Sequence, residues 1–118
     1  MEKLIITIAP TGNVPTKALN PNTPETPEEI VESVVKCREL GAAIAHLHVR
    51  DAEGKPTSER GIFKEVVDKI HERKLDVITQ LSTGARGGGN TAEWRSQMLD
   101  LNIEMASLAT GKSVDLGG

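Results

Sequence analysis

The sequence predicts an α/β fold in which parallel strands alternate with helices. Four short apolar runs are spaced along the chain, and segments with the periodicity of amphipathic helices separate them. This alternation is typical of parallel strands joined by right-handed helical crossovers. The expected order is β-α-β-α-β-α-β, in a single domain over residues 1–118.

The first expected strand is the run 4–9, Leu-Ile-Ile-Thr-Ile-Ala, whose nearly continuous apolar pattern indicates burial on both faces. A long connection carrying Pro15, Pro21 and Pro24 follows it, up to about Thr26. Such a length is unusual in a compact domain, and prolines stiffen a chain. We therefore expect this connection to form an ordered lid or pocket wall.

Capping signals and apolar spacing predict three helices. The segment 26–29, Thr-Pro-Glu-Glu, combines a threonine N-cap, a proline at the first helical position and a capping box, and this helix ends at Gly41. A second helix begins near Ser58, and a third, short one begins near Thr91. Their apolar stripes are Phe63, Val66, Val67 and Ile70 in the second helix and Trp94, Met98 and Leu101 in the third.

Three further strands complete the expected order. The second follows Gly41 and ends in His46-Leu47-His48-Val49, the third spans 76–81, and the fourth spans 104–109. The segment 50–56 is expected to be a polar turn.

His46 and His48 are the first candidate functional residues. Alternate residues of a strand share a face, so both imidazoles point the same way. Two such rings at the end of a strand supply half of a metal site, and a third ligand must come from elsewhere in the fold. The alternative is a pair of buried histidines that only bond to their neighbours, but burying two together without a shared role is costly.

Two architectures fit the element order: an open doubly wound sheet and the N-terminal half of a (β/α)8 TIM barrel. In a barrel, inward-facing residues at the C-terminal ends of the strands converge on one pocket. His48, Ser82 and Ser107 occupy corresponding places in successive units, which favours the barrel. Because a whole barrel has eight strands in typically about 250 residues, we expect an incomplete barrel, the N-terminal portion of a longer protein.

The composition excludes several classes of function. With 14 Lys and Arg against 17 Asp and Glu, the net charge is −3, which argues against a nucleic-acid surface. No stretch approaches the roughly 20 apolar residues of a membrane span, and the first strand begins too early to leave room for a signal peptide. One cysteine cannot form an internal disulfide, which fits a cytoplasmic protein.

An ordered set of motifs along the whole chain resembles the β-keto acid cleavage enzymes, typified by the 3-keto-5-aminohexanoate cleavage enzyme. Singly, Ser-Thr-Gly or His-x-His is a weak signal, whereas the ordered set is specific. The motifs are Thr11-Gly12, Asn20-Pro21, the helix start 26–29, Gly41-Ala42 before His46-Leu47-His48, and the segments 54–57, 82–84 and 104–108.

The resemblance implies a zinc-dependent TIM barrel in which a β-keto acid and acetyl-CoA exchange to give acetoacetate and a new acyl-CoA. It implies that His46 and His48 are zinc ligands, and that the third ligand, a carboxylate, lies beyond residue 118 with the general base and its partnering arginine. It also implies a homo-oligomer. The residues that it assigns to the substrate are Ser82, Thr83, Gly84, Ala85 and Ser107.

Position 14 departs from the type member of that family. The type member carries a glutamate two positions after its Thr-Gly, where this chain has Val14. Valine cannot hold a substrate ammonium, so we expect a β-keto acid with a neutral or differently charged tail.

Two other functions are alternatives. Metal-dependent barrel hydrolases also use His-x-His, but on the first strand and with more histidines than the three of this chain. A non-catalytic module could bind an anion or nucleotide through Gly84–Asn90, where Arg86 could meet a phosphate. That segment lacks the P-loop pattern and reads more simply as a pocket-edge loop.

Overall fold

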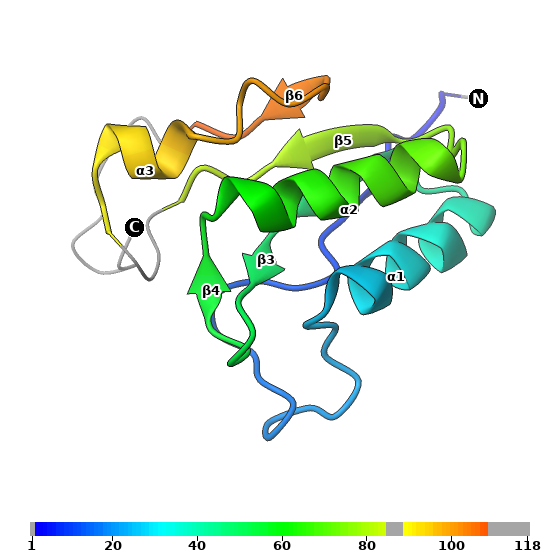
Figure 1. The fold of residues 1–118 in the computed structure, drawn as a ribbon. Coiled ribbons are helices and arrows are strands. Elements are labelled where there is room, and N and C mark those ends of the chain that lie inside the picture. Colours follow the sequence, from blue (N-terminus) through cyan, green and yellow to red (C-terminus); the bar gives the residue numbers. More distant parts are fainter. Residues whose placement is uncertain (1, 85–88, 109–118) are drawn as a thin grey trace.

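A parallel sheet of four strands forms the centre of the computed structural model, which describes residues 2–84 and 89–108 (Figure 1). The strand order is β1-β2-β5-β6. These strands are β1 (Thr7–Ile8), β2 (Ile44–Leu47), β5 (Ile78–Leu81) and β6 (Met105–Ala106). A separate antiparallel pair is formed by β3 (Val49–Arg50) and β4 (Pro56–Thr57).

Helices connect the strands of the main sheet in the predicted order. They are α1 (Pro27–Glu39), α2 (Arg60–Glu72) and the short α3 (Ala92–Ser96). All three strand pairings of the main sheet are parallel. The predicted fold class, an α/β chain with the alternation of the N-terminal half of a TIM barrel, is therefore confirmed.

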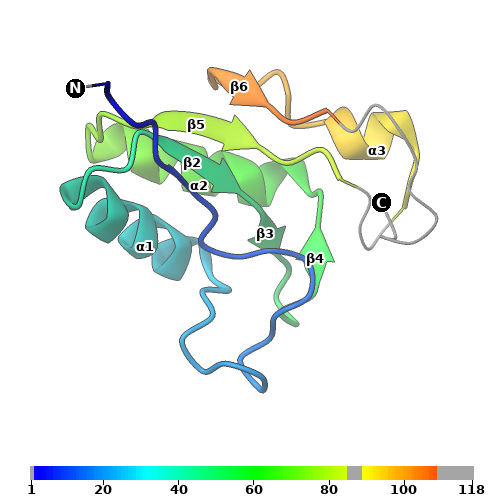
Figure 2. The same ribbon diagram turned by 180° about the vertical axis from the view of Figure 1, so that it is seen from behind.

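The core lies between the sheet and two helices on one of its faces. Helices α1 and α2 pack side by side against that face (Figures 1 and 2). The whole predicted stripe of α2 is buried, and it meets α1 and the strands in one apolar cluster. Members of the cluster from the strands include Ala45, Leu47, Val49 and Leu81.

The first strand is shorter and more exposed than its sequence predicted. It pairs with β2 through Thr7 and Ile8 alone, whereas Leu4 and Ile5 keep 85% and 71% of their surface exposed. The prediction of burial on both faces is wrong for the described residues. The reason is that β1 is an edge strand there, with no second neighbour to cover it.

The segment 50–56 is a small hairpin rather than the expected polar turn. Val49 is paired with Thr57 and Arg50 with Pro56. Asp51 Oδ1 accepts hydrogen bonds of 2.9 Å from the amides of Glu53 and Lys55, and Gly54 takes a φ of +78°, which favours glycine. Because the residues of the tight turn are polar, the sequence pattern did not predict the two short strands on either side of it.

The remaining boundaries differ from the expectation by a few residues. Strand β5 begins at Ile78 rather than 76, α2 begins at Arg60 rather than near Ser58, and β6 ends at Ala106. Thr91 is the N-cap of α3, and Met98 is fully buried beyond the end of that helix. No helix within the described residues is long and apolar enough to cross a membrane.

A carboxylate fastens the start of β6 to β5. Glu104 Oε2 accepts hydrogen bonds from the Thr79 amide at 2.9 Å and the Thr79 hydroxyl at 2.6 Å. Partial burial pushes the pKa of Glu104 upward, but these hydrogen bonds outweigh it and the net pKa is lowered. Because Thr79 is fully buried, this contact joins the sheet interior to the strand that Ser107 follows.

The predicted capping box of α1 is present. Thr26 Oγ1 accepts from the Glu29 amide at 3.2 Å, and Glu29 Oε2 accepts from the Thr26 amide at 3.2 Å. The Lys17 side chain, and then the backbone amides of Glu25 and Thr26, lower the pKa of Glu29 to about 2. A carboxylate whose pKa is lower in the folded state adds stability above its ordinary pKa and loses it on acidification.

We therefore expect Glu29→Gln to cost about 1 kcal/mol of unfolding free energy at neutral pH. The difference from wild type should shrink as the pH falls from 4.5 to about 2, where the wild-type carboxylate takes up its proton. Thermal or denaturant unfolding across this range measures it. Glu39→Gln, at the last residue of α1, is the matched control outside the capping box. A constant Glu29→Gln difference down to the lowest pH would contradict this account.

Candidate functional site

His46 on β2 and His48, in the one-residue gap between β2 and β3, lie on the face that points away from the helices. Ala45, Leu47 and Val49 are fully buried in the cluster beneath α1 and α2, whereas His46 and His48 alternate with them and are half-buried. The predicted alternation of faces is confirmed. Both rings therefore reach the side of the sheet where a ligand can approach.

Each imidazole is oriented by a side-chain amide. His46 Nδ1 lies 2.6 Å from Gln80 Oε1, and Gln80 is the register partner of His46 on β5. His48 Nδ1 lies 3.0 Å from Asn13 Oδ1. Amide oxygens only accept hydrogen bonds, so both contacts require the Nδ1 atom to carry a proton.

The two Nε2 atoms face each other at 3.2 Å, with ring centroids 5.1 Å apart and ring planes at 68°. With Nδ1 protonated, a neutral imidazole presents a lone pair at Nε2. Two facing lone pairs need a positive charge between them, either a proton on one ring or a metal ion held by both. Two nitrogen ligands at about 2.0–2.1 Å from a tetrahedral zinc lie roughly 3.3 Å apart, so the pair fits that ion.

A complete metal site is not formed by the described residues. Within residues 2–84 and 89–108, no group of three or more His, Cys, Asp and Glu side chains could hold a metal ion. Within these ranges, the pair therefore supplies two candidate ligands and no third His, Cys, Asp or Glu side chain completes the set.

Three of the predicted substrate residues, Ser82, Thr83 and Ser107, meet at the C-terminal ends of β5 and β6. The Ser82 amide donates to Leu47 O and the Ser107 amide to Leu81 O, both at 3.0 Å, so each serine follows its strand at a corresponding level. Thr83 is bonded twice to Ser107: its amide donates to Ser107 Oγ at 3.2 Å and its hydroxyl to Ser107 O at 2.6 Å. The structure thus brings these three residues together beside the histidine strand.

The glycine-bearing segment is described only in part. The Gly84 amide lies 3.4 Å from Ser82 Oγ, which curls the chain back on itself after β5. Ala85, predicted to contact the substrate, and Arg86, considered for a phosphate, lie outside the described residues, as do Gly87 and Gly88.

A hollow of about 330 Å³ opens beside His48 beneath the connection that follows β1. Thr11 lies in its wall, 5% exposed, and its hydroxyl has no hydrogen-bond partner within the described residues. The connection is therefore the pocket wall that its prolines predicted. Asn20, Asn22 and Thr23 add further polar groups to the lining.

Sequence reasoning missed the two residues that orient the histidines. Gln80 was recoverable in principle, because parallel pairing of the second and third strands places a residue of 76–81 beside His46. Asn13 was not, because its contact with His48 joins positions 35 residues apart through an irregular connection.

The sequence is similar to that of known proteins, by a family model and by direct comparison. The sequence model of the beta-keto acid cleavage enzymes matches residues 3–116. The chain is 48% identical over all of its length to the 3-keto-5-aminohexanoate cleavage enzyme of Acetoanaerobium sticklandii, and covers 42% of that protein. It is 45% identical over 91% of its length to the 3-oxoadipate:acetyl-CoA acetyltransferase of Cupriavidus necator, of which it covers 37%.

A solved structure shares the arrangement. The ternary complex of ObcA with a C4-CoA adduct and oxalate superimposes on 75% of this chain and 23% of that chain, with a TM-score of 0.68 and 26% identity. The chain thus spans less than half the length of the relatives that it matches. On its motifs, its fold and the match over residues 3–116, the chain belongs to the beta-keto acid cleavage enzyme family.

Proposed function

We propose that this chain is the histidine-bearing part of an acetyl-CoA-dependent β-keto acid cleavage enzyme. In the proposed reaction, a β-keto acid and acetyl-CoA exchange to give acetoacetate and a new acyl-CoA. The names of the two curated relatives, a keto acid cleavage enzyme and an acetyl-CoA acetyltransferase, support this reaction class. The observation that carries the proposal is the pair of Nε2 atoms, 3.2 Å apart and each oriented by an amide oxygen.

The proposed cofactor is Zn²⁺, held by His46 and His48 together with a carboxylate from beyond residue 118. The donor set supports this assignment, because neutral imidazole nitrogens suit zinc and each ring is fixed through its other nitrogen. When bound, such an ion polarises a ketone oxygen and stabilises the negative charge of an enolate, an effect worth several kcal/mol of barrier.

The proposed substrate cradle is the segment Ser82, Thr83, Gly84 and Ala85 together with Ser107. The amides of Thr83 and Gly84 already bond to the hydroxyls of Ser107 and Ser82, so these contacts hold the turn in shape. Ser107 Oγ accepts one of these bonds and keeps its own proton to donate to a substrate oxygen. These residues would orient the carboxylate and ketone of the keto acid, and the general base would come from beyond residue 118.

The proposed setting is a homo-oligomer in the cytoplasm. The family resemblance supports the homo-oligomer. The single, half-buried cysteine, Cys37, supports the cytoplasmic location. Size-exclusion chromatography with light scattering tests the oligomer, and a monomer at micromolar concentration would contradict it.

Metal analysis tests the zinc assignment. We expect about one zinc per chain in the whole protein and almost none in His46→Ala or His48→Ala, because two ligands must act together. His71→Ala, at an exposed position of α2, is the matched control and should keep its zinc. Stoichiometric zinc in both site variants would contradict the assignment.

Product analysis tests the reaction. Wild type should convert a β-keto acid and acetyl-CoA to acetoacetate and an acyl-CoA, and His48→Ala should lower kcat/KM at least about 100-fold, as expected for roughly 3 kcal/mol of lost transition-state stabilisation. Removal of zinc by a chelator should have the same effect, and its return should restore the rate. Hydrolysis of amides or esters without acetyl-CoA would instead indicate a barrel hydrolase.

A substrate panel tests the role of Val14. Its side chain is 78% exposed on the connection that walls the hollow beside His48. We expect wild type to prefer keto acids without an amino group, and Val14→Glu to raise kcat/KM for an aminated keto acid about fivefold, the value of one partly exposed ion pair. Val14→Leu is the control for bulk. An equal response to both variants would exclude a charge effect.

A further inference from the structure

Arg50 is a buried arginine whose hydrogen-bond partners within the described residues are all backbone carbonyls. It ends β3 and is 2% exposed. Its Nη1 donates to Gly54 O at 2.9 Å, and its Nη2 donates to Gly12 O and Pro15 O, both at 2.6 Å. Its Nε has no partner within the described residues. Burying a guanidinium is costly unless it is hydrogen-bonded, and these contacts to the carbonyls offset that cost.

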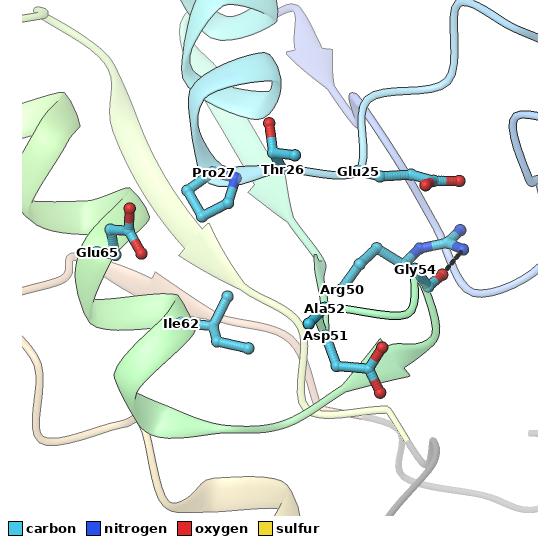
Figure 3. A pocket seen from close by; sticks show the side chains of 9 residues that line it. All are labelled: Glu25, Thr26, Pro27, Arg50, Asp51, Ala52, Gly54, Ile62 and Glu65. Carbon is cyan, nitrogen blue, oxygen red and sulfur yellow. Dashed lines mark hydrogen bonds between the residues drawn. The ribbon is translucent and has the colours of Figure 1, made fainter.

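The acidic residues near Arg50 are engaged elsewhere. Glu25, Asp51 and Glu65 line the pocket of about 230 Å³ next to the arginine. Figure 3 shows the guanidinium turned to the Gly54 carbonyl. Glu25 Oε1 accepts from the Lys17 amide, Asp51 Oδ1 caps its own turn, and Glu65 pairs with Lys69. The hydrogen bonds of the guanidinium therefore go to the carbonyls of two chain segments.

One of those segments carries the residue that orients His48. Gly12 and Pro15 flank Asn13, whose Oδ1 lies 3.0 Å from His48 Nδ1. Among the described residues, the hydrogen bonds that reach positions 10–15 come from Arg50 and from His48 alone. Arg50 therefore supplies the anchor on either side of the contact between Asn13 and His48.

We infer that Arg50 is a positioning residue for the histidine pair, acting through Asn13. This inference rests on the proposed function for its consequence at a metal. The planar guanidinium reaches Gly54 on one side and the 12–15 segment on the other at the same time. The single ammonium of a lysine cannot match this fork geometry.

Release of this anchor acts on His48 in a defined way. Once the 12–15 segment moves, Asn13 no longer accepts from Nδ1, and water takes its place. The ring then loses a contact that orients it through Nδ1, and its Nε2 is held less firmly toward His46. His46 keeps its own partner, because Gln80 lies on β5 and not on the connection.

The experiment compares Arg50→Lys, Asn13→Ala and the double variant with wild type in the whole protein. Arg60→Lys is the matched control, since Arg60 is an exposed arginine paired with Asp100. The first readout is the ring ¹H–¹⁵N signal of His48 Nδ1 in metal-free protein by NMR. The second is zinc affinity by competition with a chelator.

Each single variant should weaken or abolish the His48 Nδ1–H signal and leave that of His46 in place. Each should lower zinc affinity about 10- to 100-fold, as for other residues that orient a metal ligand. The double variant should lose no more than the larger single loss, because both changes break one chain of contacts. Arg60→Lys should match wild type in both readouts.

A wild-type His48 signal and zinc affinity in folded Arg50→Lys would overturn the inference, and so would losses that multiply in the double variant. Should Arg50→Lys fail to fold, Asn13→Ala is the deciding variant, because Asn13 is exposed. An unchanged His48 Nδ1–H signal in Asn13→Ala would show that Asn13 does not orient His48, and would overturn the inference. If wild type binds no zinc, the proposed cofactor falls, whereas the Arg50 inference is still decided by the NMR signal.

Discussion

The two faces of the extended segment 44–49, which contains β2 and the start of β3, determine the geometry of the rest of the site. Ala45, Leu47 and Val49 are fully buried under α1 and α2, and the histidines occupy the positions between them. Burial of a leucine or valine contributes about 1.5–3 kcal/mol, against about 1 kcal/mol for a hydrogen bond to a histidine. Packing therefore sets the register, and a one-residue shift would exchange the histidines with the core. The geometry of the imidazole pair follows from the hydrophobic side of the strand.

Features that depend on a local sequence pattern were predicted, whereas contacts between residues far apart in the sequence were not. The capping box at Thr26 and the alternation around His46 are local, and both are confirmed. The short hairpin that begins at Val49 was missed because two-residue strands leave no periodicity to detect. The hydrogen bond from Arg50 to Pro15 O joins residues 35 positions apart, and it depends on how an irregular connection folds back on the sheet.

The error at the first strand has a different cause. The apolar run Leu4-Ile5-Ile6 predicts a strand with a neighbour on each side, whereas the described residues supply β2 as the one neighbour of β1. The other edge strand, β6, is also exposed, and Leu108 beyond it keeps 80% of its surface. The A. sticklandii relative, of which this chain covers 42%, is more than twice as long. The apolar pattern and the observed exposure are therefore compatible within one family fold.

The two candidate ligands are oriented by different kinds of structural element, a strand and an irregular connection. His46 is oriented from Gln80, in the middle of paired strands, so its ring is fixed by the sheet itself. His48 is oriented by Asn13, which lies on a connection without a helix or strand. On either side of Asn13, this connection accepts hydrogen bonds from Arg50. The same connection walls the hollow beside His48. A disturbance of the connection thus reaches the geometry of the pair through His48 first, while His46 stays in register with β5.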